Sequence, residues 1–130
     1  MREFINIVEN TSDSVEDFMR DFESMTTHDA DDGGRVLNDV IVYISKSKYS
    51  ENSIYIEDMK TANKSEGRGG KALDAILSLA DKHKINVEIL AKSFGEGGPD
   101  TSKLISWYER HGFKVEWRGQ QGSAWMVRHA

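Results

Sequence analysis

The sequence predicts one α/β domain built on a mixed β-sheet that is mostly antiparallel, with helices packed against it. Two observations support this prediction. Helical and strand-like patterns follow one another along the 130 residues, with no internal repeat and no second domain. A strand–helix–strand unit spans Ser53 to Ala91, and its helix allows the two strands to lie parallel. The other strands follow short links and are expected to pair antiparallel.

The N-terminal part predicts one helix and two strands. Arg2 to Val8 fits either a strand or a helix. Polar residues 11–14 can cap a helix whose apolar residues fall on one face, namely Val15, Phe18, Met19, Phe22 and Met25. Val36 to Ser45 has apolar residues on both faces, which is typical of a central strand. A short turn then leads to a strand over Ser53 to Lys60, antiparallel to it.

The C-terminal part predicts two more helices and three strands. A helix over Gly70 to Lys82 carries an apolar stripe, made of Leu73, Ile76, Leu77 and Ala80. In the strand that follows, which ends at Ala91, residues Ile85, Val87 and Ile89 point inward. The next helix begins at Asp100 or Thr101 and ends at Gly112. Two strands, Phe113 to Trp117 and Ser123 to Arg128, form a closing hairpin.

A glycine-rich turn, Lys64-Ser65-Glu66-Gly67-Arg68-Gly69-Gly70-Lys71, leads directly into the first of these C-terminal helices. The free N–H groups of a helix N-terminus bind phosphate, and glycine allows the close approach. The spacing does not fit a P-loop, because Lys71 precedes Ala72 rather than Ser or Thr. It matches the dinucleotide-binding pattern only weakly, and the repeated βαβ units of that fold do not follow. A surface loop without a ligand is the remaining alternative.

Two segments together resemble the GNAT superfamily of acetyl-CoA-dependent N-acetyltransferases. Lys64 to Gly69 is similar to the family pattern Gln/Arg-x-x-Gly-x-Gly/Ala at the start of a helix, with lysine in the first place. Trp107-Tyr108-Glu109-Arg110-His111-Gly112-Phe113 is similar to the second signature, and the expected strand follows it. The resemblance covers about residues 53–128. It implies a GNAT-like sheet with one splayed parallel strand pair, in which residues 53–130 bind acetyl-CoA and residues 1–52 form a shortened acceptor side.

The resemblance also implies which residues bind the cofactor. Backbone groups of Met59, Lys60 and Thr61 would pair with the pantetheine arm of acetyl-CoA. The turn would hold the pyrophosphate by backbone N–H groups, through Glu66, Gly67, Arg68, Gly69, Gly70 and Lys71, with Lys64 at its start. The side chains of Arg68 and Lys71 either add positive charge there or are simply solvated. Thr101 stands where many relatives have an asparagine, seven residues before the family tyrosine.

Acetyl transfer to an amine requires a proton acceptor for the amine and a proton donor for the departing thiolate. By the resemblance, Tyr108 is the general acid, although a core tyrosine would show the same helical spacing. Glu57, in Tyr55-Ile56-Glu57-Asp58, resembles the glutamate of polyamine acetyltransferases and is the leading candidate for the base. An exposed strand carboxylate and a water chain to a more distant carboxylate are alternatives. Strand alternation would place Glu57 and Asp58 on opposite faces.

The composition of the chain limits which classes of partner and cofactor are expected. The net charge of −5 argues against general nucleic-acid binding and favours a cationic amine acceptor. With no cysteine, the chain has no disulfide and no thiol chemistry, and a cytoplasmic location without membrane association is expected. The four histidines lack metal-ligand spacing, so no metal is expected.

Several functional questions stay open at this point. Asp29, Asp31 and Asp32 form either an acceptor-binding loop or a solvated one. The three tryptophans are core or dimer-interface residues, which leaves a monomer and a homodimer as alternatives. The sequence therefore predicts an acetyl-CoA-dependent N-acetyltransferase. The alternatives are a non-catalytic CoA-binding module and a small interaction domain without CoA.

Overall fold

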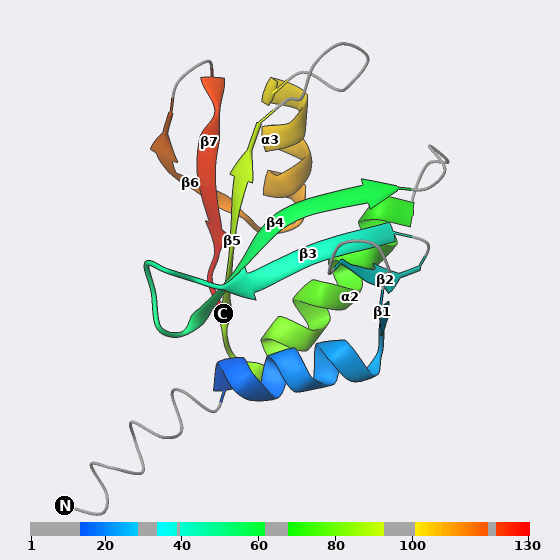
Figure 1. Cartoon of the computed structure of the whole chain (residues 1–130). Coiled ribbons are helices and arrows are strands. Elements are labelled where there is room, and N and C mark those ends of the chain that lie inside the picture. Colours follow the sequence, from blue (N-terminus) through cyan, green and yellow to red (C-terminus); the bar gives the residue numbers. More distant parts are fainter. Residues whose placement is uncertain (1–13, 29–33, 39, 62–67, 93–100, 120–121) are drawn as a thin grey trace, which may run out of the picture.

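The computed structural model describes residues 14–28, 34–38, 40–61, 68–92, 101–119 and 122–130. These residues form a seven-stranded sheet of the order β1-β2-β3-β4-β5-β7-β6, in which β4 and β5 are the only parallel neighbours among the described strands (Figure 1). A helix over residues 14–24 precedes β1 (Thr27–His28), β2 (Arg35–Leu37), β3 (Val40–Lys46), β4 (Ser53–Thr61), α2 (Arg68–His83), β5 (Asn86–Ala91), α3 (Thr101–Arg110), β6 (Lys114–Arg118) and β7 (Ala124–Arg128). The predicted mixed α/β fold is confirmed. Arg2 to Val8 lies outside the described residues.

The helix over residues 14–24 packs against the end of α2. Phe18 and Phe22 are fully buried, and the edge of the His83 ring meets Phe18 at 6.4 Å between centroids. His83 Nε2 lies 2.8 Å from Asp21 Oδ2, and this hydrogen bond is the main reason that the pKa of Asp21 is lowered. Met25 was expected on the buried face, but it is 40% exposed because the helix ends before it. That part of the prediction is wrong.

The segment predicted as a single strand, Val36 to Ser45, is a hairpin. β2 and β3 pair antiparallel up to Leu37 and Val40, which leaves a two-residue connection between them. Asn38, the first residue of this connection, has a φ of 50°, and asparagine tolerates this left-handed region better than most residues. Asn-Asp between two apolar residues is the signal that could have revealed the turn.

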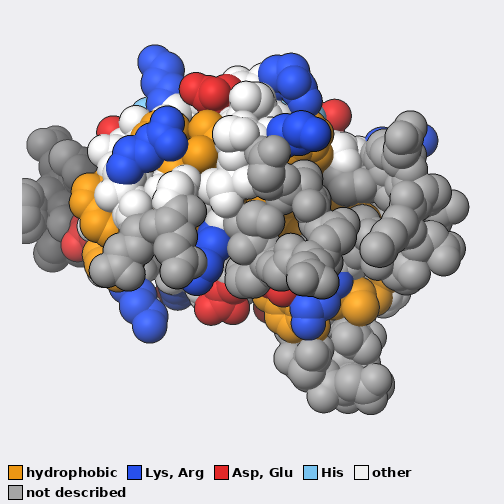
Figure 2. Space-filling model, turned by 90° about the horizontal axis from the view of Figure 1, so that it is seen from above, with side chains coloured by type: hydrophobic (Ala, Val, Ile, Leu, Met, Phe, Trp, Pro, Cys, Tyr) orange, Lys and Arg blue, Asp and Glu red, His pale blue; other side chains and the backbone are white. Residues whose placement is uncertain are grey.

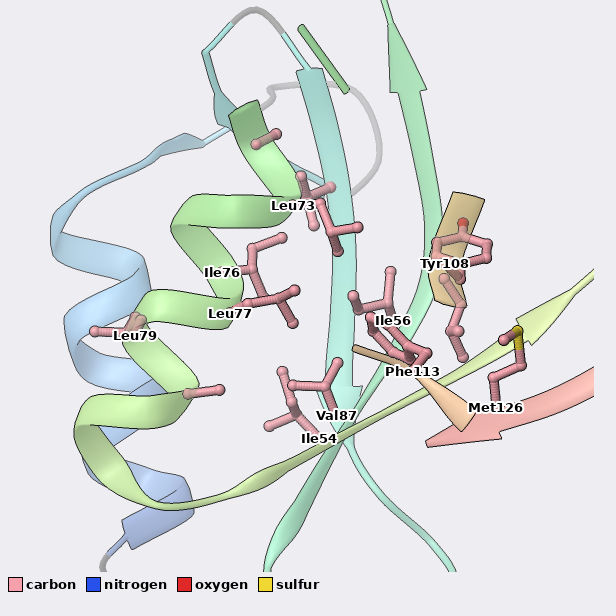
Figure 3. Close-up of a cluster of buried hydrophobic side chains, with 14 of the residues drawn as sticks. Ile54, Ile56, Leu73, Ile76, Leu77, Leu79, Val87, Tyr108, Phe113 and Met126 are labelled. Carbon is pink, nitrogen blue, oxygen red and sulfur yellow. The ribbon is translucent and has the colours of Figure 1, made fainter. Parts of the chain in front are cut away.

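The hydrophobic core lies between the sheet and helices α2 and α3, which share one face of it (Figure 3). The predicted stripe of α2 is buried as expected, through Leu73, Ile76, Leu77 and Ala80. Two contacts tie α2 to the C-terminal part of the chain. His111 Nδ1 is 3.0 Å from Asp74 Oδ1, and the Arg128 guanidinium donates two hydrogen bonds to the Asp81 carboxylate at 2.8 and 2.9 Å. We call the opposite side of the sheet the distal face.

Helices α2 and α3 end in the same way. After α2, Lys84 has a φ of 56°, and the Ile85 N–H donates to the Ala80 carbonyl at 3.0 Å. After α3, Gly112 has a φ of 97°, and the Phe113 N–H donates to the Tyr108 carbonyl at 3.1 Å. Both are Schellman motifs, in which a residue with positive φ turns the chain out of the helix. The predicted stop at Gly112 is confirmed.

These two helix ends predict opposite effects of exchanging glycine. Lys84→Gly removes the strain of a side chain at positive φ and should raise the free energy of unfolding by about 0.5–1 kcal/mol. Gly112→Ala introduces that strain and should lower it by about 1–2 kcal/mol. Urea denaturation measures both changes. Lys82→Gly, inside α2, is the matched control and should destabilise by about 1 kcal/mol. A destabilised Lys84→Gly would contradict the assignment of this helix end.

Candidate functional site

The two parallel strands of the sheet separate before they end. β4 pairs with β5 from Ser53 and Asn86 to Ile56 and Ile89, whereas β4 continues to Thr61 and β5 to Ala91. Figure 1 shows the two strands diverging beyond this point. We call the region between the unpaired ends the split. Residues Glu57 to Thr61 therefore present an edge to the split that has no β5 partner. This edge includes all three residues that the resemblance assigns to the pantetheine arm.

A β-bulge opposite Tyr43 and Ile44 changes how the residues of β4 alternate at the split. Ile44 pairs with Ile56, and Tyr43 pairs with Asp58, so Glu57 is an extra residue in β4. Because paired residues share a face, Asp58 lies on the side of Tyr43, and Glu57 lines a cavity with Tyr55 on that same distal face. The expectation that Glu57 and Asp58 point to opposite faces is therefore wrong.

Asp58 caps the exposed edge of β4. The Met59 N–H donates a hydrogen bond to Asp58 Oδ1 at 2.8 Å instead of to a neighbouring strand. Lys60, the next position on the distal face, places its Nζ 5.3 Å from the centroid of the Tyr43 ring. Asp58 is thus a residue of the site that sequence reasoning used only as a comparison for Glu57. No sequence signal marks it, because the bulge that redirects it is a tertiary feature.

Tyr108 lies at the split on the helical face of the sheet. It is 9% exposed, and its ring packs against Phe113, with the centroids 5.5 Å apart. Figure 3 shows its hydroxyl directed away from Ile56 and Phe113. Burial, with a smaller contribution from the negative charge of Asp58, raises the pKa of Tyr108 to about 12. Among the residues that the structure describes, none makes a hydrogen bond with this hydroxyl.

The start of α2 is the second part of the site. The helix begins at Arg68, so the glycine-rich turn does lead into a helix N-terminus. Gly70 approaches α3 there, since a Cβ on it would lie 3.9 Å from the Trp107 ring. Lys71 is exposed. Three predicted residues, Lys64, Glu66 and Gly67, lie outside the described residues, as do Asp29, Asp31 and Asp32. Of Thr61, Arg68 and Gly69, only the backbone is described.

Next to this helix start, the outer face of α3 is hollowed. The hollow is lined by Lys103, Leu104, Trp107 and Arg110. Two cations beside an apolar floor suit a phosphate-bearing ligand with a planar ring. Sequence reasoning missed Lys103 and Arg110, although their spacing on the helix with Trp107 could have revealed them. Thr101, predicted as a cofactor contact, is the first residue of the same helix.

The described residues include no metal cluster, and the face seen from above shows no patch of a single charge sign. Within the described ranges no group of three or more His, Asp or Glu side chains could hold a metal ion. His83, His111 and His129 each lie within 3.0 Å of one carboxylate oxygen. Seen from above, basic, acidic and hydrophobic side chains are interspersed (Figure 2). In the part of the chain that is described, every helix is too short or too polar to cross a membrane.

Comparison with known proteins supports the fold alone. The chain matches no protein-family model and no curated protein. Its structure is similar to the crystal structure of the anti-CRISPR protein AcrVA5, with a TM-score of 0.55 and 17% sequence identity. The similarity covers 71% of this chain and 92% of that one. The two proteins therefore share a fold, while few of the matched residues are identical.

The raised pKa of Tyr108 predicts a specific loss of stability in alkali. Its pKa is about 12 in the folded protein and about 10 in the unfolded chain, so the unfolded chain loses this proton first as the pH rises. The stabilising effect is complete below pH 10 and is lost as the pH rises toward 12, by up to about 3 kcal/mol. Urea denaturation from neutral pH to about pH 11.5 should show this extra loss in the parent but not in Tyr108→Phe. Parallel pH dependences would show that the hydroxyl is not buried.

Proposed function

We propose that the protein transfers an acetyl group from acetyl-CoA to a primary amine at the split between β4 and β5. The observation that carries this proposal is the unpaired edge of β4 next to the buried Tyr108 hydroxyl. A free strand edge can bind the amides of a pantetheine arm as it would bind another strand. The glycine-rich helix start supports the same conclusion, because it provides free N–H groups for a pyrophosphate at one end of such an arm.

The residues of the site fit acetyl-CoA in three places. The edge over Glu57 to Thr61 would bind the pantetheine arm. The Met59 N–H, which would donate a hydrogen bond to a pantetheine carbonyl, donates to the Asp58 carboxylate in this structure. Binding therefore requires Asp58 to release that N–H. The turn and the start of α2 would take the pyrophosphate. Lys103 and Arg110, beside Trp107, would lie near the remaining nucleotide part.

In the reaction, the neutral amine nitrogen attacks the thioester carbonyl carbon, a C–N bond forms, and the C–S bond breaks to release the thiolate. The extra proton on the attacking nitrogen leaves to solvent or to the departing thiolate, which completes the amide. An amine must first lose a proton, since its pKa is ordinarily about 10.4. Glu57 is our candidate for accepting this proton, because it lines the distal-face cavity at the end of the paired strands. The acceptor would then approach from the distal face and the cofactor from the helical face.

Tyr108 would act on the sulfur. A thiol has an ordinary pKa of about 8.5, so complete proton transfer to it from a hydroxyl with a pKa of about 12 is unfavourable. The buried hydroxyl instead stays protonated and donates a hydrogen bond to the developing thiolate. Such a fixed donor in a dry site stabilises charge that appears in the transition state. This role is narrower than that of the general acid suggested by the resemblance.

The test is acetyl transfer with purified protein, acetyl-CoA and a panel of amines and proteins. Tyr108→Phe should lower the turnover number by about 10- to 1000-fold, because it removes one preorganised donor. Its stabilisation by acetyl-CoA should stay close to that of the parent, about 2.7 kcal/mol at a concentration 100 times the Kd. An unchanged turnover number would exclude Tyr108.

Gly69→Val is the converse control, because it should lose cofactor binding, whereas Tyr108→Phe should lose turnover. A β-branched side chain at the start of α2 blocks backbone approach to the pyrophosphate, so stabilisation by acetyl-CoA should be lost while the unliganded protein stays folded. Cofactor binding without turnover on any acceptor would instead favour the non-catalytic CoA-binding module. If acetyl-CoA stabilised neither the parent nor Tyr108→Phe, a small interaction domain without CoA would remain.

The pH dependence of the rate tests the base. Glu57→Gln should lower the rate most at neutral pH, where the acceptor is mainly protonated, and the loss should shrink as the pH approaches the pKa of the amine. Asp58→Asn keeps an oxygen that can accept from the Met59 N–H and should lack this pH-dependent loss. The reverse pattern would make Asp58 the base. If neither variant shows it, the base lies elsewhere.

A further inference from the structure

A cavity of about 160 Å³ opens on the distal face beside the last paired residues of β4 and β5. Three aromatic side chains line it. The Tyr55 and Trp125 rings stack with centroids 5.2 Å apart, and the Tyr49 ring meets Trp125 edge-on at 5.6 Å. Two carboxylates, Glu57 and Glu88, also line it. We call this the Glu88 cavity.

Glu88 is the unusual member of this group. It lies on β5, between Tyr55 on β4 and Trp125 on β7, and is only 4% exposed. Ser47 Oγ donates a hydrogen bond to Glu88 Oε1 at 2.6 Å, but no Lys, Arg or His of the described residues forms an ion pair with it. A carboxylate taken out of water is costly unless a cation accompanies it. Among the described residues, Glu88 therefore lacks a positively charged partner.

The aromatic rings favour the same kind of ligand. A cation is attracted to the face of Trp or Tyr within about 6 Å of the ring centroid. The negative charges of Glu57 and Glu88 also reach this space, since after burial they are causes of the raised pKa of Tyr55. Two lysines, Lys46 and Lys48, also line the cavity. Both side chains are exposed, so water and salt screen their repulsion of a cation, and Lys46 Nζ also lies 3.6 Å from Glu16 Oε1.

We propose that the Glu88 cavity binds an ammonium group, and that it holds the second, non-reacting ammonium of an alkyl diamine whose other amine is acetylated at the split. The second half of this proposal rests on the proposed acetyl transfer. Carboxylates and aromatic rings stabilise the charged form of an amine, whereas the attacking amine must be neutral. The end of the cavity with the buried Glu88 and the aromatic rings therefore suits the nitrogen that does not react, whereas Glu57 lies at the end where the reacting amine would lose its proton.

The spacing along β4 sets the length of the diamine. Tyr55 lines the cavity, and Glu57, two residues further along β4, is the first residue beyond the paired strands. At roughly 3.3 Å per residue the two positions are at most about 7 Å apart, because the bulge at Glu57 shortens the strand there. An extended four-carbon spacer separates two nitrogens by about 6 Å. The matching probe is 1,4-diaminobutane, and 1,4-butanediol is its uncharged counterpart. Butylamine, with one nitrogen, tests the need for the second charge.

Binding is measured first without acetyl-CoA, by calorimetry. The protein should bind 1,4-diaminobutane at least tenfold more tightly than 1,4-butanediol. Glu88→Gln keeps the shape and the acceptor for Ser47 and should weaken diamine binding by about 10- to 100-fold. Tyr49→Ala, at a position that is 82% exposed and safe for folding, should weaken it by about 3- to 30-fold. Glu116→Gln, an exposed glutamate on β6, is the matched control and should change nothing.

The second measurement is acetyl transfer with the two amines. The ratio of kcat/KM for 1,4-diaminobutane to that for butylamine should exceed ten and should fall toward one in Glu88→Gln. Equal binding of the diol and the diamine, or unchanged binding in Glu88→Gln, would overturn the ammonium site. Acetyl transfer that shows no preference for the diamine would overturn the assignment to the second nitrogen. Diamine binding that depends on Glu88, without any acetyl transfer, would support the site and contradict the proposed function.

Discussion

The parallel pairing of β4 and β5 is the constraint on which the rest of the molecule depends. Four residue pairs, from Ser53 and Asn86 to Ile56 and Ile89, hold the two halves of the sheet together. Because α2 must cross from one strand to the other, its N-terminus is brought to the end of β4, beside the split. The same pairing brings Tyr55 and Glu88 side by side on the distal face. The unpaired edge of β4, the position of the α2 N-terminus and the Glu88 cavity thus all follow from one short parallel ladder.

The segment Trp107 to Phe113, which resembles the second family signature, also has a structural role that is independent of any chemistry. Gly112 ends α3 in a Schellman motif, in which the Phe113 N–H bonds to the Tyr108 carbonyl and the two rings pack together. Tyrosine, glycine and phenylalanine at this spacing therefore hold one another in position at the end of α3. The tyrosine ring is held rigidly in the core, and only its hydroxyl is left to face the split. A rigid donor of this kind loses little entropy when a ligand arrives.

Local sequence patterns predict much of the fold, and they fail where tertiary contacts determine the direction or burial of a side chain. Apolar periodicity predicts the stripe of α2 and the inward residues of β5, and Gly112 predicts the end of α3. The hairpin at Asn38 was missed because two short apolar strands in succession resemble one long strand. At the site, motifs indicate Tyr108 and the glycine-rich turn. They cannot reveal Asp58, because a bulge in β4 sets the direction of its side chain. They cannot reveal Glu88 either, because it is buried next to aromatic rings from two other strands.

The bond between Asp58 and the Met59 N–H has a consequence for the protein without a ligand. An unpaired strand edge is a template on which a strand of another chain can add, and sheets that leave such edges bare tend to aggregate. Here the donor is already occupied, and a carboxylate stands where an incoming strand would have to lie. The carboxylate that a bound pantetheine arm would have to displace in the proposed reaction therefore also opposes the addition of a strand at this edge.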